Sequence, residues 1–434
     1  MVKGELMRNR TYLKQLGNIA ARGSIIVFFV MAFEVMIMIS PFAFFFYSVF
    51  NPVLHWLGKY PATGWLTSFF LPHMILPPTL FLKAIRILGS VLFLVGAVTF
   101  TICALQVYLG KIFKWGIADK GLYRIIRHPQ YLALGLWAVG MSILWSRFLV
   151  LASLSLMFIL YYFLAKDEER RMLNQFGEGY RRYMERTGMF VPRQVEALLS
   201  APLAWVPNRA LKYVAITFGI PLVVIGSGFI LRLITLNSLL IETSRNVTLV
   251  SILPEDDSLS QRALAELFPG PDGHPNFSFF RADKDYLGYV MPADYVMQGM
   301  IADTGGEFHL HQQHNTFALI ADWVLNPFAH LRRSPSAQMA AMNKVDPAMA
   351  RRHHCPLAIN DPALHCEACP FRRIIFLEID HGYKGHLSGE KLFSFDAARV
   401  PVCFIDLNVQ TGEVLNTKRV AKATAWRDVP TPAI

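Results

Sequence analysis

Apolar residues are concentrated in four stretches of the first 240 positions. Residues 24–50 and 87–109 each form a run long enough to cross a bilayer, which takes about 20 residues in a helix. Residues 131–165 and 213–236 form two more. The pattern predicts a membrane-embedded N-terminal region.

The third stretch, residues 131–165, is too long for one span. A single helix of that length would be about 50 Å long at 1.5 Å per residue. Arg147 interrupts the apolar pattern, with Trp145 beside it. We therefore expect two helices joined by a tight turn, which brings the total to five spans.

After residue 242 the pattern changes to that of a soluble protein. Pro and Gly punctuate the chain, and β-branched apolar runs at 373–379 and 400–409 predict strands. The expected fold is an all-α polytopic membrane bundle in residues 1–241, followed by a soluble α+β C-terminal domain in residues 242–434.

Composition and charge agree with this division. Hydrophobic residues make up 53% of the 434 positions and charged residues 17%, against about 25% in soluble proteins, which argues against a disordered chain or an ordinary cytosolic enzyme. The net charge is +11. Because Lys and Arg gather in the N-terminal tail and in residues 111–127 and 166–212, these segments should be cytoplasmic. We expect a multi-pass protein of a bacterial inner membrane, an extracytoplasmic C-terminal domain and no nucleic-acid partner.

Two polar motifs flank the predicted helix pair. Residues 121–133 read GLYRIIRHPQYLA, and residues 167–193 read DEERRMLNQFGEGYRRYMERTGMFVPR. Together they resemble the isoprenylcysteine carboxyl methyltransferase-like and phospholipid methyltransferase group of integral-membrane enzymes, over about residues 80–195. The residues that carry the resemblance are Gly121, Tyr123, Arg124, Arg127, His128, Pro129, Tyr131, Glu168, Glu169, Leu173, Phe176, Gly177, Tyr180, Tyr183, Val191 and Pro192. One departure is Ala133, where the family usually has glycine.

The resemblance implies an S-adenosylmethionine-dependent methyltransferase. Its acceptor would be lipophilic or small: a lipid amine, a prenyl-linked carboxylate or a thiol that enters from the surrounding membrane lipids. The implied catalytic residues are Arg127 and Glu169, and no metal is implied. The implied cofactor-binding residues are Tyr123, Arg124, His128, Pro129, Tyr131 and Glu168.

These residue types also suit the cofactor chemically. Carboxylates accept hydrogen bonds from ribose hydroxyls or an ammonium group, and arginine meets a carboxylate with two parallel bonds. Tyrosine rings attract a cation. Pro129 is tolerated in the first turn of a helix, so the third span should begin there.

Simpler interpretations remain for each motif. The arginines fit headgroup anchors, Glu168 and Glu169 fit a solvated helix end, and Tyr180 and Tyr183 fit an aromatic belt at the membrane interface, which is the reading we favour for these two. A sterol-reductase-like bundle that uses NADPH is another alternative.

The C-terminal region carries histidines and cysteines at short spacings. Thiolate and imidazole at such spacings bind zinc or copper, C-x-x-C can be a redox pair, and four cysteines outside the cytoplasm can also form plain disulfides. The alternative function is therefore a membrane-anchored metal-binding or thiol-redox protein whose bundle is only a scaffold. The residues concerned are His309, His311, His314, His353, His354, Cys355, His365, Cys366, Cys369 and Cys403.

Overall fold

The computed structural model describes residues 53–113, 119–268, 279–304, 371–422 and 433–434. Short gaps fall at 205, 207, 294, 296–297, 383–384, 388 and 409–410, and isolated described residues lie at 23 and between 318 and 329. The chain forms two compact units. One comprises the described part of Leu88–Ile230, and the other the described parts of Ile39–Ile87 and Leu231–Ile434.

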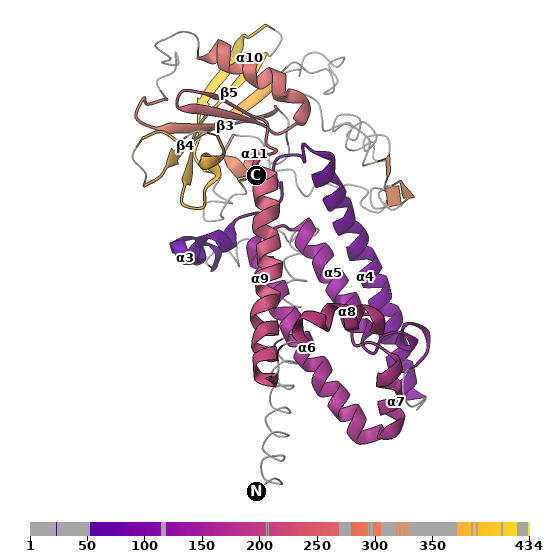
Figure 1. The fold of residues 1–434 in the computed structure, drawn as a ribbon. Coiled ribbons are helices and arrows are strands. Elements are labelled where there is room, and N and C mark those ends of the chain that lie inside the picture. The colour runs from indigo at the N-terminus through magenta and orange to yellow at the C-terminus, as the bar shows by residue number, and fades with distance from the viewer. Residues whose placement is uncertain are drawn as a thin grey trace. The chain divides into compact units, whose positions relative to one another are not determined.

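The first unit is helical, and the first and last of its helices extend a few residues beyond its boundaries (Figure 1). Their bounds are α4 Leu80–Ile112, α5 Pro129–Leu144, α6 Phe148–Phe176, α7 Glu178–Arg186, α8 Arg193–Ala204 and α9 Arg209–Leu236. Helix α5 begins at Pro129, as the sequence predicts. The predicted break also occurs, since α5 ends at Leu144 and α6 starts at Phe148.

Among the residues that the structure describes, three helices are long and apolar enough to cross a membrane: Leu80–Gly110, Phe148–Phe176 and Ala210–Leu236. Helix α5 is apolar but has only 16 residues, which is below the usual spanning length. The first predicted span, residues 24–50, lies outside the described residues. The count of five spans is therefore not confirmed.

Glycines let α4 and α5 approach closely. A Cβ atom at Gly96 would collide with the main chain of Trp137, and one at Gly140 would collide with the main chain of Phe93. Ala133, which stands where the related family has glycine, is fully buried in α5. The close approach therefore comes from α4 at Gly96 and from a later turn of α5.

The second unit is built on a six-stranded sheet in the order β1-β2-β3-β4-β5-β6, so an α+β region follows the helices as predicted. Strands β2 and β3 are parallel, and the other neighbours are antiparallel. The predicted strands at 373–379 and 400–409 correspond to β4 and β5. The strand bounds are β1 Ile241–Ser244, β2 Val247–Ser251, β3 Asp285–Pro292, β4 Phe371–Asp380, β5 Ala398–Asn408 and β6 Val414–Arg419.

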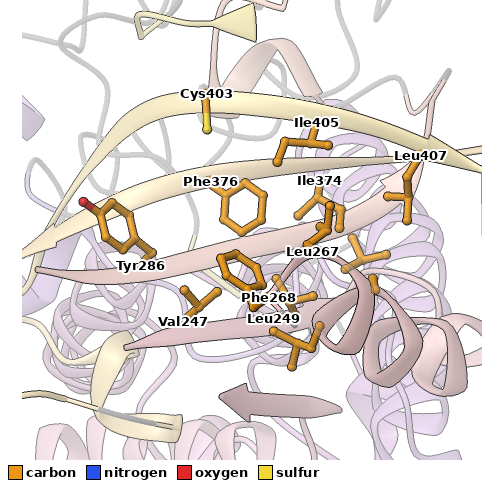
Figure 2. Packing of buried hydrophobic residues seen from close by; sticks show 13 residues of the cluster. Val247, Leu249, Leu267, Phe268, Tyr286, Ile374, Phe376, Cys403, Ile405 and Leu407 are labelled. Carbon is orange, nitrogen blue, oxygen red and sulfur yellow. The ribbon is translucent and has the colours of Figure 1, made fainter. Parts of the chain in front are cut away.

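Alternate residues of the sheet face helix α10 (Asp257–Leu267), since strand side chains alternate between faces. Figure 2 shows Val247, Phe376 and Cys403 in this cluster with Leu267 of α10. Gly288 of β3 leaves room for the cluster, because its Cβ would press on Leu249 and Phe376. The cluster is the core of the second unit.

The second unit also contains residues that precede the helical unit in the sequence. Short helices α3 Pro61–Gly64 and α11 Gln298–Ile301 lie in this unit as well. The apolar residues between Phe69 and Ile75 are buried, and the main-chain amides of His73 and Met74 donate to the main-chain oxygen of Ile434. This segment packs within the sheet-bearing unit.

Candidate active site

The two sequence motifs meet at the open end of the α5–α6 hairpin. Main-chain hydrogen bonds join them: the amide of Arg127 donates to Gly188 (2.8 Å), and the amide of His128 donates to Met189 (3.0 Å). Ile126 and Gly188 form a parallel β-bridge. A Cβ atom at Gly188 would collide with the oxygen of Val191, so this crossing requires glycine.

Arg127 and Glu169 form a buried ion pair. The Nε atom of Arg127 lies 2.6 Å from Oε1 of Glu169, and the side chains are 7% and 4% exposed. Arg127 also donates through Nη1 to the oxygens of Met184 (3.1 Å) and Thr187. These contacts tie α6 to the end of α7.

His128 lies between the two glutamates. Its Nδ1 atom is 3.4 Å from Glu168 and its Nε2 atom 3.8 Å from Glu169. Burial by itself lowers the pKa of His128, but the interaction of the imidazole with the two nearby carboxylates outweighs this effect, so the pKa is raised above its ordinary value. No hydrogen-bond partner reaches the buried Nε2 atom within the described part of the chain.

Tyrosine rings line the cluster. The hydroxyl of Tyr131 donates to Glu168 (2.8 Å), and the ring stacks between those of His128 and Tyr161, at centroid distances of 5.5 and 5.1 Å. The hydroxyl of Tyr123 donates to the side-chain oxygen of Gln130. Glu168 is the partly open carboxylate, with 32% of its side chain exposed.

The structure thus brings together most of the residues predicted for the site. Arg127, His128 and Tyr131 contact Glu168 or Glu169, and Pro129 is the first residue of α5. Arg124, however, is exposed on the short 3-10 turn Gly121–Arg124. In the part of the chain that the structure describes, it forms no ion pair with Glu168 or Glu169.

Tyr180 and Tyr183 do not lie in an aromatic belt, contrary to our reading of the sequence. They are 3% and 7% exposed, because the chain turns at Gly177, whose φ of 55° suits glycine, and α7 folds back on the site. The hydroxyl of Tyr183 donates to the oxygen of Tyr123 (2.6 Å).

Sequence reasoning missed Glu196. Its carboxylate accepts a hydrogen bond from the amide of Met189 (2.6 Å) and so fixes the segment that pairs with Arg127 and His128. Neither a motif nor a periodicity marks this residue. Its only signal is a single acidic residue in the first turn of α8.

Comparison with known proteins agrees with these motifs. Residues 81–179 match the family model described as phospholipid methyltransferase, which confirms the resemblance stated from the sequence. The matched segment includes the site from Tyr123 to Glu169 but ends before α8 and the sheet. No curated protein and no solved structure matches the chain.

The cysteine-rich alternative falls largely outside the described residues. Cys355, Cys366, Cys369 and the histidines of the same region lie there. Cys403 is described, and it is buried in the core cluster beside Phe376. Burial raises the pKa of its thiol to about 12, which opposes the thiolate that metal binding or redox exchange requires.

Proposed function

We propose that the helical unit is an S-adenosylmethionine-dependent methyltransferase that acts at the membrane on a lipophilic or small acceptor. The observation that carries this proposal is the cluster formed by the buried Arg127, His128 and Glu169 with the partly exposed Glu168. It lies within the segment that matches a methyltransferase family. Candidate acceptors are a lipid amine, a prenyl-linked carboxylate or a thiol.

The residues present suit the cofactor. The Nε2 atom of His128 is buried without a hydrogen-bond partner among the described residues, and such atoms are costly unless a ligand pairs with them. Glu168 offers a partly exposed carboxylate, which can accept hydrogen bonds from ribose hydroxyls or an ammonium group. When bound, S-adenosylmethionine supplies a methyl group on a positively charged sulfur.

In this proposal the main contribution of the protein to catalysis is to position the cofactor and the acceptor. Methyl transfer is a displacement in line with the leaving group, so alignment and exclusion of water lower its barrier. Glu168, His128 and Tyr131 would bind and orient the cofactor, with Pro129 at the helix start and Tyr123 behind them. For Arg124 the proposed binding role requires its exposed side chain to turn toward the cofactor.

Arg127 and Glu169 are better described as positioning residues than as groups that contact the acceptor. The guanidinium of Arg127 is already engaged by Glu169 and by the oxygens of Met184 and Thr187. Its side chain is 7% exposed. Together the pair would fix His128 and the end of α6 in the geometry that the cofactor needs.

The test is binding of labelled S-adenosylmethionine to the full chain in detergent. We expect saturable binding and a rise in Tm by mass action, reduced by His128→Ala and unchanged by Arg182→Ala on the exposed face of α7. NADPH should neither bind nor raise Tm. Saturable NADPH binding without S-adenosylmethionine binding would instead support the reductase alternative.

A further inference from the structure

The sheet-bearing unit contains a cavity of about 360 Å³. It lies on the sheet face opposite α10. Tyr289, which lines the cavity, is the residue between Gly288 and Val290, and Val290 faces the α10 cluster. The volume is within the range of small-molecule sites.

The lining of this cavity is strongly basic. Four of its residues carry a positive charge, and none of the described lining residues is acidic. The four come from separate segments, so folding gathers them rather than sequence proximity. They are Lys59, Arg232, Arg399 and Lys422.

Main-chain oxygens hold Arg399 in place, and no carboxylate pairs with it among the described residues. Its Nη2 atom donates to the oxygens of Leu392 (2.8 Å) and Ser394 (3.0 Å), and its Nη1 atom donates to Ala397 (3.2 Å). Its Nε atom is buried and has no hydrogen-bond partner in the described part of the chain. Burial lowers the pKa of Arg399, so the folded protein bears an electrostatic cost at this position.

Arg232 is fixed in the same manner. It is 6% exposed, donates to the main-chain oxygens of Phe69 and Phe393, and lies 4.6 Å from the ring centroid of Phe395. Carbonyl oxygens orient the guanidinium but do not neutralise it. Arg232 is buried and Arg399 is partly buried, and neither pairs with a carboxylate in the part of the chain that the structure describes, so a bound anion would stabilise both.

The surroundings of the cavity resemble a membrane interface. Arg232 belongs to α9, an apolar helix long enough to span a bilayer. Near Lys59, the aromatic residues Trp56 and Tyr60 are 56% and 50% exposed. Exposed Trp and Tyr side chains are enriched at the headgroup region of a membrane.

We propose that this cavity binds a phosphate group, carried by a phospholipid headgroup or by a soluble phosphoester. Arginine is the residue best suited to phosphate, which accepts several charge-assisted hydrogen bonds at once. The lysines would add electrostatic attraction at the rim. The site is separate from the proposed methyl-transfer site and does not depend on it.

The experiment uses the full chain, delipidated in detergent, with three probes: glycerol 3-phosphate, dioctanoyl phosphatidylglycerol and dioctanoyl phosphatidylcholine. Binding of glycerol 3-phosphate would identify a soluble source, and preference for phosphatidylglycerol over phosphatidylcholine would identify a headgroup. In either case Arg399→Gln should weaken binding about tenfold, the size of one charge-assisted hydrogen bond. Lys418→Ala, at an exposed lysine of β6 outside the cavity, should change nothing.

A second variant keeps the test decisive if Arg399→Gln does not fold. The double variant Lys59→Ala/Lys422→Ala removes two rim charges and should weaken binding several-fold, with a larger loss at low salt. The proposal is overturned if the folded wild-type protein binds neither anionic probe. It is also overturned if binding survives the substitutions in the cavity unchanged.

Discussion

The Nε atom of Arg127 lies 2.6 Å from a carboxylate oxygen of Glu169, and less than a tenth of either side chain is exposed. Forty-two positions and a helical hairpin separate the two residues in the sequence. Since both belong to polar motifs that flank this hairpin, the ion pair closes its open end.

Removing one partner should therefore destabilise the helical unit. Glu169→Gln leaves the Arg127 guanidinium buried without its counter-charge, a change that costs about 3–5 kcal/mol in comparable pairs. The control is Glu178→Gln, which breaks an exposed pair with Arg181 and should cost less than about 1 kcal/mol. Unfolding in mixed micelles measures both, and equal losses would show that the Arg127–Glu169 pair is not buried as described.

His128 and Glu168 should act together on the cofactor. His128→Ala and Glu168→Ala should each weaken binding of S-adenosylmethionine, and the double variant should weaken it by less than the product of the single effects, since both groups serve one ligand. Glu169 provides a second test, because neighbouring helix positions point about 100° apart. Normal affinity and turnover after replacement of both glutamates by Ala would disprove the site.

The raised pKa of His128 predicts a pH dependence of stability. The ordinary value is about 6.5, and the folded protein raises it. The protonated side chain therefore adds stability that is fully present below the ordinary pKa and is lost as the pH rises through the folded pKa. The Tm difference between wild type and His128→Asn should therefore shrink as the pH rises above about 6.5. A difference that grows with pH would contradict the assignment.

The topology can be tested with single cysteines. Thr187 is unsuitable because it is buried, but Glu185 and Ser258 are exposed. In a background with Cys355, Cys366 and Cys369 replaced by serine, a membrane-impermeant thiol reagent should label Glu185→Cys and Ser258→Cys from opposite sides. Labelling from the same side would mean that the number of spans between them is even.

Cys403 should be inert in the folded protein. Its burial and its pKa of about 12 leave almost no accessible thiolate at neutral pH. Iodoacetamide labelling at this position, followed by peptide mass spectrometry, should be slow in the native protein and fast after denaturation. Rapid labelling of the native protein would show that Cys403 is accessible, and it would support the thiol-redox alternative.

Local patterns were enough to predict much of the fold. The hairpin break at Arg147, the start of α5 at Pro129 and the strands β4 and β5 all follow from hydropathy or from proline chemistry within a few residues. The parallel pairing of β2 with β3 could not be predicted in this way. It depends on how α10, which lies between the two strands in the sequence, packs on the sheet. The burial of Tyr180 and Tyr183 depends likewise on how α7 folds back.

The candidate site also combines contacts that the sequence predicts with contacts that it does not predict. The meeting of His128 with Glu168 was predictable, since residues that flank an antiparallel hairpin return to the same end. The oxygens of Met184 and Thr187, which accept from Arg127, were not predictable, because every residue has a carbonyl oxygen and none is marked by its type. Arg124 belongs to the motif, but its side chain is exposed on the 3-10 turn, so its binding role stays a prediction.

The β-bridge between Ile126 and Gly188 has a consequence for how a ligand would be received. The hydrogen bonds around it join main-chain atoms only, so they need neither a ligand nor a particular side chain. The amides of Arg127, His128 and Gly188 should therefore exchange slowly with deuterium before any ligand is added. A site that is ordered in advance loses little conformational entropy on binding, and the residues facing an acceptor can vary without loosening the frame that holds them.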